Sequence, residues 1–263
     1  MCLILFALEA HPRYRLVLAA NRDEFYDRPT APASFWDDAP QVLAGRDLTG
    51  GGTWCGITTG GRIAAVTNYR DPRTYREGAP SRGRLVADFL RGEMTPAALL
   101  ERLHREGNSY NGFNLIFGDG SELLYFSNRG ALPARVPAGI HGLSNHLLDT
   151  PWPKVARGKE ALAKLLAARD EPAPDDLFAI LADRTPAPDH LLPDTGVGPE
   201  RERLLSPLFI ATPTYGSRSS TVILIGRDNT CTFVERSFNG AADHPRTVKF
   251  RFTIALPVTF PVR

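Results

Sequence analysis

The N-terminal 27 residues constrain the fold of this chain more than any other stretch. Two apolar runs, residues 3–7 and 16–20, are separated by a polar segment at 9–15, and the second run leads directly into Asn21-Arg22-Asp23-Glu24. Two apolar runs of strand length joined by a short polar segment are typical of a β-hairpin. The strands of a hairpin are antiparallel, so the polar end of the second strand lies beside the start of the first. The sequence therefore predicts that Cys2 lies near an arginine and two carboxylates.

Cys2 is a candidate nucleophile whose own α-amine could act as its base. Removal of Met1, which is common before a small residue, would leave Cys2 with a free α-amine. An α-amine has a pKa of roughly 7.7–8.0 and a thiol one of about 8.5, so the two groups can share a proton near neutral pH. An adjacent amine activates N-terminal threonine nucleophiles, and the charge of Arg22 would favour the thiolate. The alternative interpretation is that Cys2 is a small apolar residue at the start of a strand.

Length and charge bound the class of protein. The chain of 263 residues is long enough for a sizeable core, and we expect one domain over residues 1–263 with a poorly ordered tail at 254–263. The 31 basic and 29 acidic residues are interspersed, which argues against nucleic-acid binding and against a polybasic membrane patch. No apolar run reaches the length of a membrane span, and no signal peptide is recognisable. We therefore expect a cytoplasmic protein, whose oligomeric state the sequence leaves open.

The cysteines and histidines do not form a disulfide or metal pattern. Cys2, Cys55 and Cys231 are an odd and sparse set, which argues against a disulfide framework. Cys55 and Cys231 are interpreted as small buried residues. The six histidines are scattered, so no metal site is predicted, and chemistry at Cys2 would require no cofactor.

The rest of the chain alternates between short strands and amphipathic helices. Strands are predicted at 41–44, 53–58, 62–67, 113–117, 123–127, 139–144, 219–225, 231–237 and 247–252, and helices at 81–91, 96–105, 153–168 and 174–182. Residues 28–40 are expected to be irregular, and the proline-rich residues 185–199 to form a loop. Strands cluster toward both ends with helices between them, which favours an α+β fold with antiparallel sheets.

Short motifs along the chain resemble those of one family. The motifs are Met1-Cys2, Leu18-Ala19-Ala20-Asn21-Arg22-Asp23-Glu24-Phe25-Tyr26, Gly51-Gly52-Thr53-Trp54, Val66-Thr67-Asn68-Tyr69, Tyr110-Asn111-Gly112-Phe113-Asn114-Leu115, Gly142-Leu143-Ser144-Asn145, Thr150-Pro151-Trp152 and Tyr215-Gly216-Ser217-Arg218. They resemble, in order and to about Phe252, the NRDE family, which is the transport and Golgi organisation protein family. That family resembles N-terminal-nucleophile hydrolases, in particular cysteine amidases that cleave bile-salt conjugates and penicillin V.

The resemblance implies a fold and a set of catalytic residues. The implied fold is a four-layer αββα sandwich of two mainly antiparallel sheets, with the helices outside. Cys2 matches the nucleophile, Arg22 and Asp23 match an ion network beside it, and Arg218 matches a second arginine that faces it. Asn68 and Asn145 match the side-chain amides that hold the oxyanion of a tetrahedral intermediate.

Several of these residues also have a purely structural interpretation. Adjacent residues of a strand point to opposite faces, which favours Arg22 over Asp23 as the residue that reaches the site. Asn68 and Asn145 follow apolar strands, where asparagine is a common turn former. Arg218 also fits an exposed loop cation.

The aromatic motif residues are candidates for ligand binding. Trp54 and Trp152 can line a pocket or fill the core, and the core is favoured for Trp54. Tyr69 lies in a family motif and is placed with them as a ligand-binding candidate. Arg22 and Arg218 complete this set, because a guanidinium recognises carboxylates in bidentate fashion.

The family resemblance implies intracellular handling or trafficking of haem, or of a similar hydrophobic and acidic small molecule. Haem would then be a bound ligand, and lipid-like molecules are the other candidates. His141 and His146 flank Asn145, but an isolated histidine is more often a surface or hydrogen-bonded residue than an iron ligand. The residues themselves favour an alternative, a cysteine amidohydrolase in which Cys2 attacks a linear C–N amide bond. A scaffold role has no heptads or repeats to support it.

Overall fold

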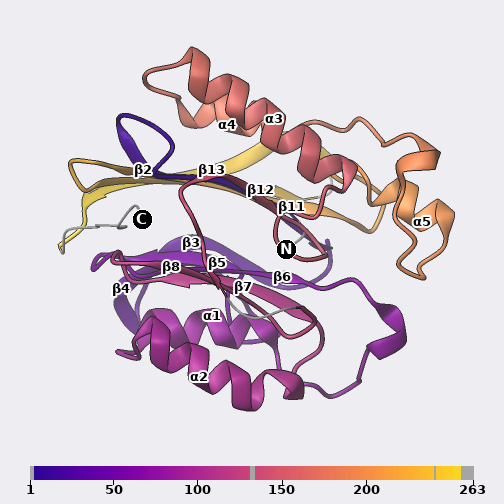
Figure 1. Ribbon diagram of the computed structural model, residues 1–263, viewed down its shortest axis with the longest axis horizontal. Coiled ribbons are helices and arrows are strands. Elements are labelled where there is room, and N and C mark those ends of the chain that lie inside the picture. The colour runs from indigo at the N-terminus through magenta and orange to yellow at the C-terminus, as the bar shows by residue number, and fades with distance from the viewer. Residues whose placement is uncertain (1–2, 131–133, 240, 256–263) are drawn as a thin grey trace.

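The computed structural model describes residues 3–130, 134–239 and 241–255, and these form four layers (Figure 1). Two β-sheets pack face to face, and helices cover the outer face of each. The strand pairs within the described residues are antiparallel. This arrangement confirms the predicted α+β class and the αββα sandwich.

The first sheet contains the predicted N-terminal hairpin at its centre. Its strand order is β10-β1-β2-β11-β12-β13. The strands are β1 (Leu3–Leu8), β2 (Tyr14–Phe25), β10 (Gly139–Leu143), β11 (Tyr215–Gly226), β12 (Thr230–Asn239) and β13 (Ala241–Thr253). β11 pairs with β2 as far as Phe25, so the Asn21-Arg22-Asp23-Glu24 run lies within the sheet rather than beyond its edge.

The second sheet packs beneath the first, in the order β3-β4-β5-β6-β7-β8-β9. Its strands are β3 (Thr30–Trp36), β4 (Ala39–Asp47), β5 (Cys55–Thr58), β6 (Ile63–Asn68), β7 (Phe113–Gly118), β8 (Leu123–Ser127) and β9 (Ala134–Arg135). The predicted strands at 53–58, 62–67, 113–117 and 123–127 correspond to β5 to β8, within two residues at each end.

Four helices form the two outer layers (Figure 1). α1 (Arg82–Arg91) and α2 (Pro96–Glu106) cover the second sheet, and α3 (Pro153–Ala168) and α4 (Pro174–Leu181) cover the first. Thr95 begins α2 as a cap, since its side chain accepts a hydrogen bond from the Ala98 N–H. Short 3₁₀ helices lie at η1 (Pro72–Thr74), η2 (Gly107–Ser109) and η3 (Asp189–Leu191), and α5 (Pro199–Leu204) projects beyond one end of the sheets.

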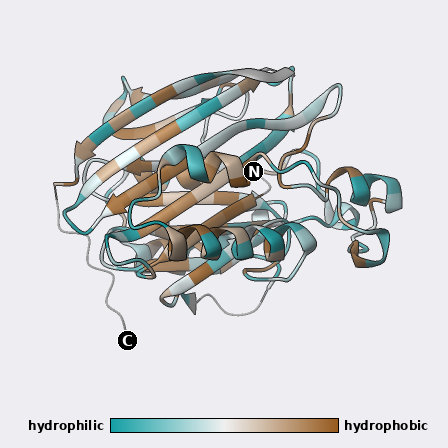
Figure 2. Ribbon diagram, turned by 90° about the horizontal axis from the view of Figure 1, so that it is seen from above, coloured by the Kyte–Doolittle hydropathy of each residue, from teal (hydrophilic) through white to brown (hydrophobic). Residues whose placement is uncertain are grey.

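The core between the sheets follows from the alternation of side chains along each strand. Ile4 and Phe6 of β1 face the second sheet, whereas Leu3 and Leu5 pack beneath the helices of the first. Figure 2 shows the hydrophobic stretches that run along the central strands. No helix within the described ranges is both long and apolar enough to cross a bilayer.

The alternation continues to the end of β2 and separates its polar residues. Asn21 points to the helix layer, where its Nδ2 donates to the Leu181 carbonyl of α4 at 2.9 Å. Arg22 points to the inner face, where its guanidinium lies over the ring of Trp54. Asp23 returns to the outer face and accepts a hydrogen bond from the Ser217 hydroxyl at 2.6 Å. The structure therefore places Arg22 and Asp23 on opposite sides of the sheet.

One prediction about the chain is wrong, and the boundaries of three others differ from the structure. Residues 28–40 are not irregular, because β3 forms the edge of the second sheet, and a register shift between Ala31 and Ser34 accommodates Pro32. The strand predicted at 41–44 is the middle of the longer β4, and the predicted loop at 185–199 contains η3 and leads into an unpredicted helix, α5. In the predicted tail, Ile254 packs into the core between the sheets, and residues 256–263 lie outside the described residues.

Candidate functional site

Two adjoining cavities form a cleft at the end of the sandwich from which α5 projects. The first has a volume of about 280 Å³ and the second of about 290 Å³. They share Asn68, Tyr75, Arg82 and Asn111 in their walls, so the two make one continuous cleft. Asn68 is the last residue of β6, and Arg82 is the first residue of α1. The cleft is therefore built where β6 and the connection to α1 leave the second sheet.

An arginine cluster lines the second cavity. Arg22, Arg28 and Arg82 are accompanied there by Glu24 and Asp47, so the cations exceed the carboxylates by one. The Arg28 guanidinium donates to Asp47 at 2.9 Å. Burial of Asp47 opposes ionisation, but its hydrogen bonds from the Gly50 N–H and from Arg28 outweigh burial and lower its pKa. Asp47 is thus held as a carboxylate by Arg28.

Arg22 is buried but only loosely paired. Its closest approaches to Asp47 and Glu24 are 3.6 Å and 3.7 Å, and its Nη1 donates to the Thr30 hydroxyl at 3.3 Å. Its Cζ lies 4.4 Å from the centroid of the Trp54 ring. Burial lowers the pKa of Arg22, because the charged form is removed from water. A buried guanidinium without a close carboxylate partner is well suited to receive an anionic group.

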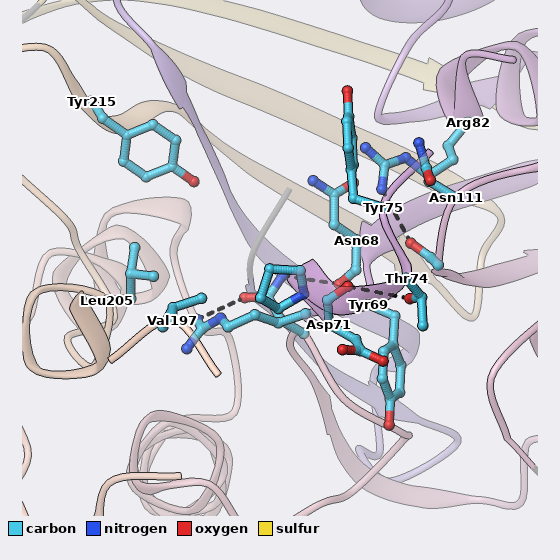
Figure 3. Close-up of a pocket in the computed structure, with 14 residues that line it drawn as sticks. Asn68, Tyr69, Asp71, Thr74, Tyr75, Arg82, Asn111, Val197, Leu205 and Tyr215 are labelled. Atoms are coloured by element: carbon cyan, nitrogen blue, oxygen red, sulfur yellow. Dashed lines mark hydrogen bonds between the residues drawn. The ribbon is translucent and has the colours of Figure 1, made fainter. Parts of the chain in front are cut away.

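The first cavity has a polar wall and an apolar wall. Figure 3 shows Asn68, Tyr75, Arg82 and Asn111 gathered on one side, with Val197, Leu205 and Tyr215 on the opposite side. Among the described residues, none forms a hydrogen bond with the Asn68 side chain. Its carboxamide is therefore available to a bound molecule.

Asn145 also lines the first cavity, and its carboxamide is fully oriented. Its Nδ2 donates to the Asn68 carbonyl at 2.9 Å, and its Oδ1 accepts from Arg70 Nη2 at 3.1 Å. Arg70 Nη1 donates in turn to Glu202 at 2.6 Å. The predicted pair Asn68 and Asn145 is thus brought together by the ends of strands in different sheets.

Arg218 lies in a third and smaller cavity of about 80 Å³. Its Nη1 donates to the Tyr26 carbonyl, and Trp54 forms part of the walls of both this cavity and the second. Trp54 is buried in the core between the sheets as well, so it fills both of the roles considered for it. Arg218 therefore lines a cavity that shares Trp54 with the second cavity of the cleft.

Tyr69 lines the first cavity, whereas Trp152 and the two histidines considered do not line the cleft. The Trp152 ring packs against His146, with 5.7 Å between centroids, and Arg70 lies over it at 4.9 Å. His141 is hydrogen-bonded to Asp149 at 2.7 Å. Asp23 lies on the outer face of the first sheet. Neither Trp152 nor Asp23 therefore lines the two cavities of the cleft.

Cys2 lies outside the described residues. The description of the chain begins at Leu3, the first residue of β1, whose Cα partner is Asn21. Cys55 and Cys231 are both buried and free, and burial raises the pKa of each thiol to about 12. Their prediction as buried residues is confirmed. No group of histidine, cysteine and acidic side chains that could hold a metal ion occurs in the described ranges.

Sequence reasoning missed several residues of the cleft and its surroundings. Arg70 directly follows the Val66–Tyr69 motif and Asp47 lies four residues before Gly51, so nearness to a motif was the available signal for these two, whereas Arg82 lies in the predicted helix at 81–91, away from any motif. Glu202 and Glu235 had no such signal, since neither lies near a quoted motif. Glu235 is buried at the third cavity, where it accepts a hydrogen bond from the Ala33 N–H at 2.7 Å. Burial raises the pKa of Glu235 to about 7.

A solved structure has the same architecture. The C2A mutant of the conjugated bile acid hydrolase from Clostridium perfringens aligns with a TM-score of 0.51, covering 100% of this chain and 99% of that one. The sequences are only 9% identical, so this likeness concerns the fold alone. It confirms the predicted N-terminal-nucleophile hydrolase-like fold.

Sequence comparison identifies the family. A profile of the family described as Transport and Golgi organisation 2 matches residues 1–240. The Transport and Golgi organization protein 2 homolog of Bos taurus is 41% identical over 261 residues, which cover 92% of this chain and 94% of that protein. The Homo sapiens homolog is 37% identical over 275 residues, covering 97% and 99%. The chain therefore belongs to the Transport and Golgi organisation 2 family.

Proposed function

We propose that this protein binds and carries a hydrophobic, acidic small molecule in the cleft, and that haem is the first candidate. The observation that supports the proposal is that arginines and apolar or aromatic side chains together line the cleft formed by the two joined cavities. In each cavity the lining arginines exceed the lining carboxylates by one. A ligand that offers a carboxylate at one end and an apolar body at the other matches this division.

Arg22 and Arg82 are the proposed partners of the ligand carboxylates. Arg22 is buried and has no carboxylate within 3.5 Å among the described residues. Arg82 stands at the first turn of α1, where the N-terminal end of the helix dipole adds positive potential. Guanidinium groups bind carboxylates in bidentate geometry, which orients a ligand as well as holding it.

Aromatic residues at the rim support an apolar ligand body. Tyr75 is 69% exposed and Phe25 is 55% exposed, although both carry a large aromatic ring. The Phe25 ring packs edge-on against Tyr215, which lines the first cavity. Exposed apolar side chains that surround a concave site are typical of a binding surface.

Titration of the purified protein with haem tests this proposal. We expect a saturable shift of the Soret band, and roughly tenfold weaker binding in Arg22→Gln, which loses a charged hydrogen-bonding partner worth about 1.4 kcal/mol or more. Arg102→Gln is the matched control, because Arg102 pairs with Glu106 on the surface of α2. A spectrum identical to that of free haem would exclude haem as the ligand. Equal affinities in both variants would exclude Arg22 as its partner.

A second candidate function is cleavage of an amide bond, with Cys2 as the nucleophile. Two observations favour it, the hydrolase-like fold and the Asn68 carboxamide, which has no hydrogen-bond partner in the described part of the chain. This mechanism requires the Cys2 thiol to reach the cleft beside Arg22 and Asn68, which line the second cavity. The thiolate would attack the amide carbonyl, the α-amine would protonate the leaving amine, and water would then hydrolyse the thioester.

Two measurements test the amidohydrolase. Intact mass of the native protein should show loss of Met1, since a retained Met1 would leave Cys2 without a free α-amine. Cys2→Ala should abolish turnover of any amide substrate without changing the affinity for a carried ligand at Arg22. Turnover that survives Cys2→Ala would eliminate the mechanism.

A further inference from the structure

Residues 192–205, called the flap below, form the apolar wall of the first cavity. Val197 and Leu205 of the flap face Asn68 across the cavity (Figure 3). The flap includes α5 and projects beyond the sheets (Figure 1). It has no buried apolar side chain, and its only buried residues are Thr195 and Glu202. The hydrophobic effect therefore contributes little to holding the flap in place.

Polar contacts of Glu202 hold the flap instead. Glu202 is 2% exposed, and its Oε1 accepts hydrogen bonds from the Thr195 N–H and hydroxyl at 2.9 Å and 2.6 Å. Its Oε2 accepts from Arg70 Nη1 at 2.6 Å. The flap is also tied through Arg203, which pairs with Asp189 in η3, but both of those side chains are largely exposed. An exposed ion pair contributes little stability, so the contact with Arg70 dominates.

Arg70 uses the same guanidinium to orient Asn145. Its Nη2 donates to Asn145 Oδ1, which fixes the carboxamide so that its nitrogen points toward the Asn68 carbonyl. Without that donor, the carboxamide would be oriented only by its hydrogen bond to the Asn68 carbonyl. One planar, five-donor side chain therefore contacts both the flap and the amide, which a lysine could not do in the same geometry.

We propose that Arg70 and Glu202 are positioning residues that couple the seating of the flap over the first cavity to the orientation of the Asn145 carboxamide. The inference rests on the proposed function in one respect, that the cleft is the ligand site. With the flap seated, the first cavity has its apolar wall and Asn145 presents an N–H donor beside Asn68. With the flap displaced, Arg70 loses its carboxylate partner and shifts, and Asn145 then loses one of the two hydrogen bonds that orient its carboxamide. Ligand enclosure and the polarity of the cavity then change together.

Trypsin digestion of the native, ligand-free protein tests the first half of the coupling. Arg201 and Arg203 are tryptic sites within the flap, and cleavage of a native segment follows the population of its open form. Glu202→Gln removes the charge that Arg70 binds, and we expect cleavage at these sites to become roughly tenfold faster or more. Asp189→Asn is the matched control, because it removes the exposed ion pair of the same segment and keeps both tryptic sites. It should change the rate by less than about twofold.

The side-chain amide signals of Asn145 test the second half. In protein labelled with ¹⁵N at asparagine, Asn145→Asp assigns the pair of signals. Arg70→Lys keeps the positive charge for Glu202 but removes the second donor, so we expect near-normal trypsin resistance together with displaced Asn145 signals. Glu202→Gln should change both readouts, displacing the Asn145 signals and opening the flap to trypsin. Thr195→Val removes one hydrogen bond to Glu202 and should increase the cleavage rate less than Glu202→Gln does. It replaces Glu202→Gln in the cleavage test if that variant fails to fold.

Two outcomes would overturn the coupling. Equal cleavage rates for Glu202→Gln, Asp189→Asn and the unmodified protein would show that Glu202 does not hold the flap. Faster cleavage with unchanged Asn145 signals would show that the flap and the amide are independent. Tryptic cleavage and the Asn145 signals are both measured without ligand. Absence of haem binding or of amide hydrolysis would therefore count against the proposed function without affecting the test of the coupling.

Discussion

Arg22 Cζ lies 4.4 Å from the centroid of the Trp54 ring, although the two residues come from different sheets. Arg22 extends from the inner face of β2 in the first sheet, and Trp54 immediately precedes β5 in the second. Their contact closes the space between the sheets beside the cleft. Trp54 also lines both the second and the third cavity. The position of this ring therefore affects both the stability of the sandwich and the shape of the ligand site.

Gly45→Ala should displace the Trp54 ring. A Cβ at Gly45 would lie 2.3 Å from Trp54 Cη2, which is far inside van der Waals contact. We expect the free energy of unfolding to fall by about 1–3 kcal/mol, the usual cost of overpacking a core, and ligand affinity to fall with it. Urea denaturation measures the first effect. Gly60→Ala is the control, because the nearest atom to its added Cβ is 3.7 Å away. Equal stabilities of the two variants would contradict the predicted role of the ring.

Glu235 should make stability fall as pH rises. Its pKa is raised by burial from about 4.5 to about 7, so between these values the folded chain keeps a proton that the unfolded chain releases. Unfolding then releases a proton, and higher pH favours the unfolded state. Stability is unaffected by Glu235 below pH 4.5, declines up to pH 7, and is lower by on the order of 3 kcal/mol above that.

Glu235→Gln should remove this dependence. Glutamine resembles the protonated acid and can still accept the Ala33 hydrogen bond. We expect the variant to match the unmodified protein in urea denaturation at pH 5 and to exceed it at pH 8. Parallel stability curves over this range would show that Glu235 does not titrate between its ordinary pKa and pH 7.

Asp47→Asn should raise the affinity of the cleft for an acidic ligand. The substitution removes one negative charge beside Arg22 and Arg28, and the carbonyl oxygen of asparagine can still accept the Gly50 N–H. We expect affinity to increase by about threefold to tenfold at low salt, and this gain to shrink as salt rises. Ligand titration at two ionic strengths measures it. Asp38→Asn, at the exposed pair with Arg46 and Arg91, should leave affinity unchanged.

Asn68→Ala should separate the two proposed functions. If an amide substrate is hydrolysed, loss of an oxyanion donor should lower kcat by about 10²–10³-fold while KM changes little. If the protein only carries its ligand, the same variant should show a modest change in Kd. Asn108→Ala, an exposed asparagine of η2, is the control for both measurements. A kcat equal to that of the unmodified enzyme would remove Asn68 from the proposed mechanism.

The sequence was sufficient for elements whose signal is local. The N-terminal hairpin, α1 and α2 were recognisable because alternation, helical spacing and the Thr95 cap depend on neighbouring residues alone. β3 was missed because its prolines are a signal against strands, and only its place at a sheet edge makes Pro32 acceptable. α5 was missed because its six residues lack an apolar face.

By itself, the sequence determined the strand that carries Asn21-Arg22-Asp23-Glu24, the family motifs and the alternation that separates Arg22 from Asp23. Tertiary structure alone decided that Arg22 stacks on Trp54, that Asn145 meets Asn68, and that Glu202 reaches Arg70 across 132 residues. The physical reason is that alternation is a property of one strand, whereas these contacts depend on which apolar faces are buried against each other. That choice is made by the packing of the two sheets, which no local pattern specifies.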